Sequence, residues 1–416
     1  MRIKCQFLII FILITITLAG GAEIDTSLVL PEGFEAYIFA DNLGRARHIV
    51  CDNDGDLYVA LRELNQGKGI VALRDSDNDN QAEEIKYFFD QPGTGLAWQN
   101  NYLYFAPDTA VYRFKFDGDE LIPNNSPENI VKNLEKQRQH AAKSITLDQK
   151  GNLYVNIGAP SNACQEQMRT PGVAGMDPCP LLEKYGGIWR FDSDKIGQKF
   201  SDAYHYATGI RHCVALDWNN QCQELYAVMH GRDQLYSLWK EKFSREQNAK
   251  LPAEQFILID EGANFGWPYC YYDHFQEKKV LAPEYGGDGK QTGRCEQYDD
   301  PLIGFPAHWA PNDIIFYDKQ QFPKKYHQAA LIPFHGSWNR APFPQQGYKV
   351  VAVPFNDCRK WTDWEVFADG FSGKKIIKSP YEAEYRPMGL ATAPDGGLFI
   401  SDSRKGRIWK IVYKGE

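Results

Sequence analysis

The phrase that decides the fold reads His48-Ile49-Val50-Cys51-Asp52-Asn53-Asp54-Gly55-Asp56-Leu57-Tyr58-Val59. A short apolar stretch is followed by a turn of aspartate, asparagine and glycine, and then by a second apolar and aromatic stretch. Such turn residues tolerate the positive φ angles of tight hairpins, so the phrase predicts two antiparallel strands. Because one hairpin cannot bury its apolar face alone, it needs neighbours of the same kind.

The phrase occurs six times in the chain. The five later copies, two of them more diverged, occupy residues 95–105, 144–155, 213–228, 314–332 and 389–400. Similar units stacked radially around an axis bury their faces against one another, so the repeats predict an all-β fold, a six-bladed β-propeller. Two β-sandwich domains are the alternative. The wider spacing between the fourth and fifth copies predicts a loop insertion at about 262–310, of the kind that decorates one face of a repeat protein.

The N-terminus has the three parts of a secretory signal peptide. A basic start at Arg2 and Lys4 is followed by the apolar run from Phe7 to Leu18 and by small residues up to Ala22. The apolar run is short for a membrane span, which makes a retained anchor the weaker reading. We therefore expect residues 1–22 to be a signal peptide and 23–416 to form a single propeller domain. The mature chain is expected to be secreted or periplasmic, without a membrane contact.

Charge and cysteine content narrow the class further. The 54 acidic residues exceed the 46 basic ones and give a formal charge of −8, which argues against a nucleic-acid partner. Cys5 leaves with the signal peptide, so eight of the nine cysteines remain, an even number that suggests disulfides in an exported chain. Pairing of sequence neighbours predicts the bonds Cys164–Cys179, Cys213–Cys222 and Cys270–Cys295.

Polar residues recur just before the inner strand of several predicted blades. In a propeller these loops face the mouth of the central channel. The runs are residues 139–143 with His140, 206–212 with Arg211, 335–340 with Arg340 after the fifth copy, and 385–388 with Arg386. Arginines that converge repel one another and bind carboxylates well, so the pattern predicts an anionic ligand with several carboxylates.

Five segments together resemble the soluble sugar dehydrogenases that depend on pyrroloquinoline quinone (PQQ), in particular the sorbosone dehydrogenase branch of this sorbosone/glucose dehydrogenase-like family. They are His140, Tyr206 to Arg211, Gly262 to Pro268, His335 to Arg340 and Arg386 to Leu390. The resemblance covers essentially the whole mature chain. It implies a six-bladed β-propeller that holds PQQ over a Ca²⁺ ion.

The resemblance also implies roles for single residues. His140 matches the general base, and Arg211 matches an arginine beside the quinone oxygens. Contacts to the cofactor are implied for five more residues: His212, Trp338, Asn339, Arg340 and Arg386. The main-chain carbonyls of Gly231 and Arg232 match the Ca²⁺ ligands. The glucose-oxidising branch has Gly-Pro where this chain has Gly231-Arg232, and asparagine where it has His212, so the substrate stays open.

A separate acidic loop opens with Asp75, Asp77 and Asp79 in the D-x-D-x-D spacing of calcium loops. It lacks the glycine at the sixth position, and Lys86 replaces the glutamate at the twelfth, so it is not an EF-hand. The alternatives are a structural Ca²⁺ site and a solvated hairpin turn.

The sequence thus predicts an exported quinoprotein that oxidises the hydroxyl, hemiacetal or aldehyde carbon of a sugar or a sugar-derived compound. The chain has no G-x-G-x-x-G after a strand for NAD and no C-x-x-C-H for haem, so electrons must leave to an external acceptor. A Ca²⁺-dependent lactonase-type hydrolase is one alternative, although it favours carboxylates rather than arginines at the blade mouths. A non-catalytic binding propeller is the other.

Overall fold

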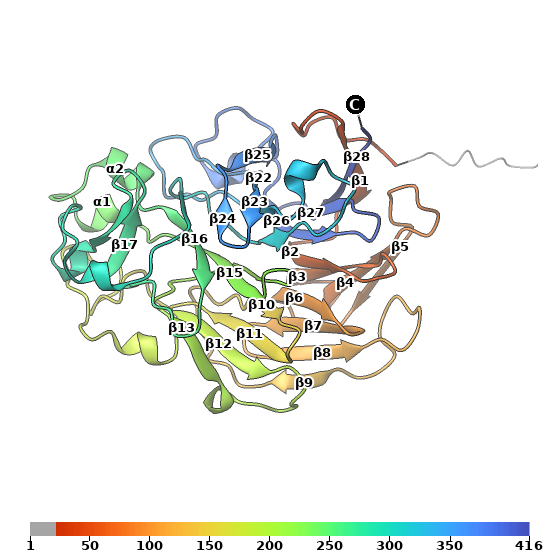
Figure 1. Cartoon of the computed structure of the whole chain (residues 1–416), viewed down its shortest axis with the longest axis horizontal. Helices are drawn as coiled ribbons and strands as arrows, with labels where there is room; N and C mark the ends of the chain where they lie inside the picture. The colour runs from red at the N-terminus through yellow and green to blue at the C-terminus, as the bar shows by residue number, and fades with distance from the viewer. Residues whose placement is uncertain (1–21, 416) are drawn as a thin grey trace, which may run out of the picture.

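The computed structural model describes residues 22–415 and shows six four-stranded antiparallel sheets arranged in a ring (Figure 1). The predicted six-bladed β-propeller is therefore confirmed. From the axis outward, blade 1 consists of β2 (Ala46–Cys51), β3 (Leu57–Asn65), β4 (Lys68–Arg74) and β5 (Glu84–Phe88). Blade 2 consists of β6 (Gly93–Gln99), β7 (Tyr102–Pro107), β8 (Val111–Lys115) and β9 (Glu128–Val131). Blade 3 consists of β10 (Ile145–Leu147), β11 (Asn152–Ile157), β12 (Gly187–Asp192) and β13 (Tyr204–Thr208).

Blades 4 to 6 follow the same order of strands. Blade 4 consists of β14 (Ala215–Asn219), β15 (Glu224–Met229), β16 (Glu254–Ile259) and β19 (Ile303–Phe305). Blade 5 consists of β20 (Ile315–Phe316), β21 (Ala330–Phe334), β22 (Lys349–Val353) and β25 (Glu365–Ala368). Blade 6 consists of β26 (Pro387–Thr392), β27 (Leu398–Asp402), β28 (Ile408–Tyr413) and β1 (Phe34–Ala40). Each copy of the repeated phrase forms the two innermost strands of one blade.

The turn inside the phrase is held by its first aspartate. The Oδ1 atom of Asp52 accepts hydrogen bonds from the backbone N–H groups of Asp54, Gly55 and Asp56 at 2.9–3.0 Å. Asp148 does the same in blade 3, where it accepts from the N–H of Asn152 at 2.9 Å. An aspartate that bonds its own following backbone favours a turn over a continued strand, which explains why the phrase folds as a hairpin.

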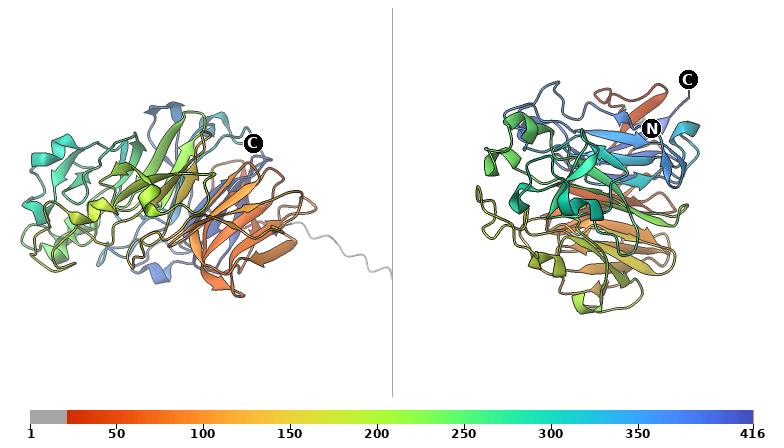
Figure 2. Two further views of the ribbon diagram at one scale, coloured as in Figure 1. Left: turned by 90° about the horizontal axis from the view of Figure 1, so that it is seen from below. Right: turned by 60° about the vertical axis from the view of Figure 1, so that its left-hand side comes forward.

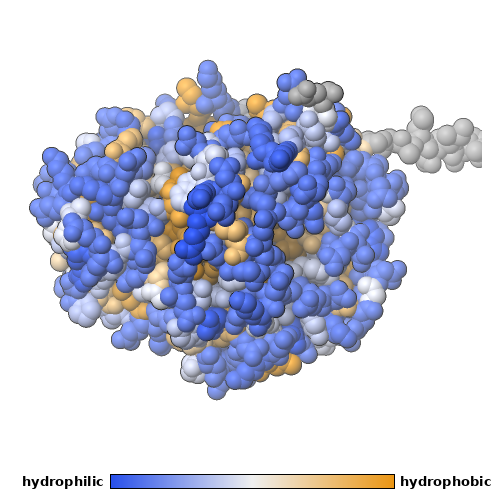
Figure 3. All heavy atoms as spheres, in the orientation of Figure 1, coloured by the Kyte–Doolittle hydropathy of each residue, from blue (hydrophilic) through white to orange (hydrophobic). Residues whose placement is uncertain are grey.

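The hydrophobic core lies between adjacent blades. Leu57 to Leu61 of β3 are fully buried, because successive side chains pack alternately against blade 6 and blade 2. Hydrophilic residues cover most of the face drawn in Figure 3, and hydrophobic residues show mainly in its recessed middle. No helix within residues 22–415 is long and apolar enough to cross a membrane.

The ring closes where the two ends of the chain meet in blade 6. β1 pairs with β28 in antiparallel register, from Phe34 opposite Tyr413 to Ile38 opposite Trp409. In Figure 1 this closure appears where the red start of the chain lies against its blue end. The expected signal peptide falls almost entirely outside the described residues.

Blade 4 carries the largest additions to the ring. The helices α1 (Leu235–Leu238) and α2 (Arg245–Lys250) stand between β15 and β16. The hairpin of β17 (Cys270–Asp273) and β18 (Lys278–Leu281) stands between β16 and β19, so the expected insertion falls within blade 4 rather than between blades. These segments gather at one side of the disc (Figures 1 and 2).

Three disulfides cross-link the described chain. Cys164–Cys179 and Cys270–Cys295 are the predicted pairs and are confirmed. The predicted Cys213–Cys222 bond is wrong, because Cys222 pairs with Cys358 and Cys213 is a free, buried thiol. Cys222 lies in the turn between β14 and β15, and Cys358 lies in the turn between β23 (Phe355–Asp357) and β24 (Lys360–Trp361). Neighbouring blades bring these turns together, which sequence proximity does not reveal.

Candidate active site

Histidines and arginines gather at the end of the ring where the inner strands begin. We call this group the polar cup and define it by seven residues: Arg47, His140, Arg211, His212, His230, His335 and Arg386. They come from loops or strand ends of five blades. Three of them touch directly, since the ring of His212 stacks on His140 at a centroid distance of 4.7 Å and meets His230 edge-on at 5.4 Å.

His140 has a defined tautomer. Its Nδ1 atom lies 2.5 Å from the carbonyl oxygen of Ala159, which cannot donate, so Nδ1 carries the proton and Nε2 keeps a free lone pair. Burial, and then the positive charge of Arg211, lower the pKa of His140 to about 3. The ring is therefore neutral at pH 7 and able to accept a proton at Nε2.

Arg211 is buried and neutralised by a carboxylate. Its guanidinium donates to Oδ2 of Asp233 at 3.0 Å, to Oδ1 of Asn162 at 3.1 Å and to the carbonyl oxygen of Gly231 at 3.0 Å. Burial acts to raise the pKa of Asp233, but the opposing charges, that of Arg211 above all, hold it at about 2. Asp233 therefore stays ionised and fixes Arg211 in place.

Arg386 and Arg47, on the other side of the cup, have no carboxylate partner among the described residues. The guanidinium of Arg386 donates only to main-chain oxygens, those of His335 at 3.0 Å and Gly336 at 2.6 Å. Arg47 makes no side-chain hydrogen bond within residues 22–415, and its Nε atom is buried. Burial, and then the charges of neighbouring arginines, lower the pKa of Arg47 to about 9. This side of the cup thus holds two guanidinium groups that form no ion pair with a carboxylate within residues 22–415.

A layer of side-chain to main-chain bonds forms the floor of the cup. Nε2 of His48 lies 2.8 Å from the carbonyl oxygen of Asn312. The hydroxyl of Ser144 donates to the carbonyl oxygen of Val214 at 2.6 Å. These bonds span from blades 1 and 3 to the loops before β20 and β14. The central channel beyond the floor is a cavity of about 520 Å³ between the inner strands.

The segment from Trp338 to Arg340 is engaged differently from Arg386. The guanidinium of Arg340 is buried and donates to the carbonyl oxygens of Ala249 at 2.6 Å and Pro344 at 3.0 Å. The carbonyl oxygen of Asn339 accepts from the side chain of Asn248, while Trp338 is about half exposed. The segment therefore packs on α2, and its role at the cofactor stays a prediction.

Gly231 and Arg232 lie beside Arg211. The carbonyl oxygen of Gly231 accepts one hydrogen bond, from Arg211, and keeps a second lone pair. The side chain of Arg232 points away from the cup into a buried ion pair with Glu284 of the 3₁₀ turn Pro283–Tyr285. Arg232 thus anchors the blade 4 insertion to the cup loop, and only its main chain is available as a ligand.

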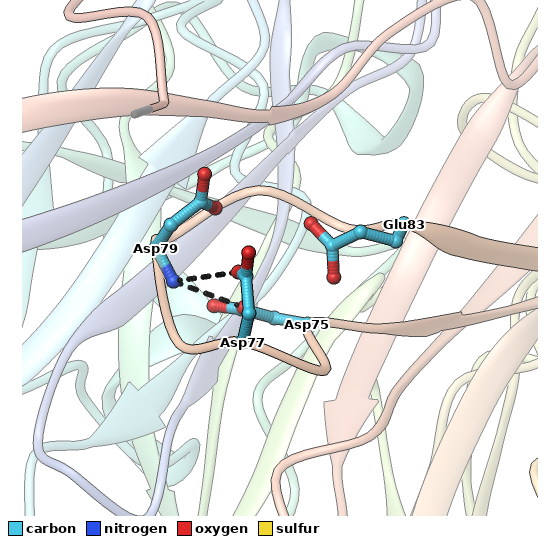
Figure 4. Close-up of side chains that lie close together, drawn as sticks. All are labelled: Asp75, Asp77, Asp79 and Glu83. Atoms are coloured by element: carbon cyan, nitrogen blue, oxygen red, sulfur yellow. Dashed lines mark hydrogen bonds between the residues drawn. The ribbon is translucent and has the colours of Figure 1, made fainter. Parts of the chain in front are cut away.

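The acidic loop lies between β4 and β5, outside the cup. Asp75, Asp77, Asp79 and Glu83 point toward one another, with one oxygen from each within 4.8 Å of the others (Figure 4). Asp75 and Asp77 also accept hydrogen bonds from the backbone N–H of Asp79 at 3.2 and 3.3 Å. The structure thus adds Glu83 to the three aspartates that the sequence motif indicates.

Residues 28–414 match the sequence profile of one protein family, described as TrAA12-like. The chain belongs to the TrAA12-like family. Another chain that matches is an uncharacterised protein from Borreliella burgdorferi, which is 25% identical over 97% of this chain and 96% of its own length.

Solved structures of two fungal proteins share the fold of this TrAA12-like chain. The holo form of the pyranose dehydrogenase PQQ domain from Coprinopsis cinerea superposes with a TM-score of 0.73 at 19% identity, over 92% of this chain and 97% of that one. The calcium structure of a Trichoderma reesei protein of carbohydrate-active enzyme family AA12 gives 0.75 at 19% identity, over 93% and 97%. The resemblance indicated by the sequence motifs is confirmed at the level of family and fold.

Sequence reasoning missed two basic residues at this end of the ring. Arg47 precedes His48 at the start of the first copy, the position that Lys143, His212 and Met388 occupy in other copies, so the repeat could have revealed it. Arg62, at the end of β3, binds Asp108 through two parallel bonds of 2.6 and 2.9 Å. It lies after the second strand of its copy, whereas the repeat predicts site residues before the first strand.

Proposed function

We propose that this chain is an exported sugar oxidoreductase that binds PQQ and Ca²⁺ at the polar cup and oxidises a CH–OH group of a sugar or sugar-derived compound. The observation that carries the proposal is the positive charge of Arg47 and Arg386, two part-buried guanidinium groups that lack any carboxylate partner within residues 22–415. Buried charges are costly unless they are paired, so this side of the cup is built for an anion.

The donor set fits a polycarboxylate cofactor. Nε of Arg47 and Nε of Arg211 are both buried without a hydrogen-bond partner. We assign contacts with the carboxylates and quinone oxygens to Arg47, Arg211 and Arg386, and the adjoining wall to His212 and to Trp338, Asn339 and Arg340. PQQ supplies a two-electron acceptor when it is bound. Arg47 is an addition to the contacts implied by the sequence motifs.

We assign the Ca²⁺ of the cup to the main-chain carbonyls of Gly231 and Arg232. Hard carbonyl oxygens suit this ion, and the carbonyl of Gly231 keeps one lone pair for it. A second, structural Ca²⁺ is proposed at Asp75, Asp77 and Asp79, where Glu83 supplies a fourth carboxylate.

His140 is the proposed general base. Its Nε2 lone pair would take the proton of the substrate hydroxyl, and PQQ, when bound, would supply the acceptor for the hydrogen and electron pair of the carbon that bears this hydroxyl. Ala159 keeps the ring in the required tautomer through Nδ1. Arg211 would place its positive charge beside bound PQQ, which supplies the two-electron acceptor. An external acceptor would then take the electrons.

The lactonase alternative has less support. It needs carboxylates free to hold a catalytic metal, whereas Asp233 is bound by Arg211, and Asp108 by Arg62. The three disulfides support an oxidising compartment, in line with a secreted or periplasmic location.

The test is a titration of the purified apo-protein with PQQ and Ca²⁺, followed by dye reduction with a panel of sugars. We expect saturable PQQ binding and sugar-dependent dye reduction that both require Ca²⁺. Absence of PQQ binding and of dye reduction would overturn the proposal. Lactone hydrolysis without PQQ would establish the hydrolase instead, and PQQ binding with no turnover on any sugar would favour a binding propeller.

A further inference from the structure

The backbone of His140 adopts a conformation that residues other than glycine rarely take. Its φ angle is +52°, in the left-handed region, within the loop between β9 and β10. Such a conformation costs free energy and persists only when the surroundings enforce it. The loop must therefore contain contacts that hold His140 in place.

Gln137 provides the first of these contacts. Its amide nitrogen lies 2.9 Å from the carbonyl oxygen of Gln139, 2.8 Å from that of His140 and 2.7 Å from that of Gly158. Two N–H bonds are shared among three acceptors, so one side chain ties His140 both to its own loop and to the strand end after β11. Gly158 closes the other side, because a Cβ there would lie 2.7 Å from the Cβ of His140.

Lys143 provides the second contact and is a costly residue to place here. Its side chain is fully buried, and its ammonium donates to the carbonyl oxygen of Ala141 at 2.7 Å and to Oε1 of Gln137 at 3.5 Å. No carboxylate within residues 22–415 forms an ion pair with it, since Asp108 is taken by Arg62. A buried ammonium with so little compensation destabilises a fold, so stability does not explain its presence.

We propose that Gln137 and Lys143 are positioning residues that hold His140 in its left-handed conformation, with Nδ1 on Ala159 and Nε2 toward the cup. Gln137 fixes the carbonyls on both sides of the loop, and Lys143 fixes Ala141 and orients the amide of Gln137. Neither residue touches the substrate. The role rests on the proposed function of His140 as a general base.

The kinetic test uses Gln137→Met and Lys143→Met, which keep side-chain length but remove the donors. We expect kcat to fall by about 10- to 100-fold, the effect of misplacing a reacting group by about 1 Å, with KM and PQQ affinity changed by less than about twofold. Lys143→Met should also melt at the same temperature as the wild type or higher, because it removes a poorly compensated buried charge. Lower activity in a fold of equal or greater stability is a result that a merely structural lysine would not give.

Two matched controls lie away from the cup. Gln198 is a buried glutamine whose amide likewise contacts three carbonyls, those of Ile130, Asp192 and Lys195, in the loop between β12 and β13. Lys279 is a buried lysine in the blade 4 insertion that, unlike Lys143, has a carboxylate partner, Asp300 at 3.9 Å, so its removal also breaks an ion pair. We expect Gln198→Met and Lys279→Met to lower thermal stability while leaving kcat within about twofold of the wild type.

A spectroscopic measurement separates this inference from the proposed function. The imidazole ¹⁵N signals of His140, assigned by their loss in His140→Ala, should show the Nδ1–H tautomer in the wild type. We expect Gln137→Met and Lys143→Met to lose or shift that signature. Variants that keep both the signature and full kcat would overturn the inference. If the wild-type enzyme oxidises no sugar, the proposed function fails, and the NMR signature alone still decides whether these residues position His140.

Discussion

The two sides of the polar cup treat their arginines in different ways. On the side of blades 3 and 4, Arg211 is paired with Asp233 and bonded to Asn162 and Gly231. On the side of blades 6 and 1, the guanidinium of Arg386 is bonded only to main-chain carbonyls, and that of Arg47 has no hydrogen-bond partner in the described chain. Arg211 therefore has a carboxylate partner before any ligand arrives, one that it shares with Arg169, whereas Arg386 and Arg47 have no carboxylate partner within residues 22–415.

This difference teaches how one pocket can serve two tasks. A group that must take part in proton transfer needs fixed surroundings, and His140 lies on the balanced side. A group that must capture an anion gains most if nothing in the protein already neutralises it. We therefore expect substitutions on the two sides to divide between turnover and cofactor binding.

The substitution His140→Ala tests the difference between the two sides most strongly. We expect the rate of sugar oxidation to fall by about 10²- to 10⁴-fold, the usual contribution of a general base, while PQQ affinity stays the same. Steady-state dye reduction and PQQ titration of the same preparation measure both quantities. Full activity in this variant would remove His140 from the mechanism.

Substitutions on the other side should show the reverse division. We expect Arg47→Met and Arg386→Met to weaken PQQ binding by about 10- to 100-fold each, since a hydrogen bond to a charged group contributes about 1.5–3 kcal/mol. With saturating PQQ, kcat should stay within a few-fold of the wild type. Arg294→Met is the matched control, because Arg294 of the insertion pairs instead with Asp177 in the loop between β11 and β12. Unchanged PQQ affinity in both variants would contradict the assignment of this side to the cofactor.

The pH dependence of activity tests the side of the cup that carries His140 and Arg211. Burial and Arg211 lower the pKa of His140, so the neutral, proton-accepting form persists to lower pH than in an ordinary histidine. Activity should be lost only as pH falls through this lowered pKa, which places the acid limb of kcat/KM below 6.5. Asp233→Asn should move the limb lower still, because the carboxylate partly offsets Arg211. An acid limb at or above 6.5 in the wild type would contradict this expectation.

The smallest expected effect concerns the acidic loop, whose charge is negative where that of the cup is positive. We expect millimolar Ca²⁺ to raise the melting temperature by a few degrees through binding to the native state, and Asp77→Asn to reduce that shift. Differential scanning calorimetry with EDTA as the metal-free reference measures both. An equal shift in Asp77→Asn would locate the stabilising ion elsewhere.

The repeated hairpin phrase was enough to predict the fold, because a turn aspartate and alternating apolar residues act locally. Contacts between distant segments were not predictable in this way. Cys222 and Cys358 are 136 residues apart and meet only because blades 4 and 5 are neighbours.

Part of the site was also predictable from the repeat. His140, Arg211 and Arg386 stand two to four residues before the start of their copies, and the structure places all three at one end of the ring. The position of Arg340 could not be read from the repeat, because its side chain bonds to α2, an addition specific to blade 4. Arg47 was missed although it directly precedes the first copy, since a lone arginine in a sequence shows nothing about its missing partners.

The pairing of β1 with β28 sets an order of events in the making of the protein. Residues 34–40 are synthesised before the five intervening blades, whereas their partners, residues 408–413, are synthesised after them. β1 therefore stays without its partner strand while those five blades are synthesised. A chain truncated anywhere before Ile408 leaves blade 6 incomplete, and a nascent chain cannot close the ring before β28 has been synthesised.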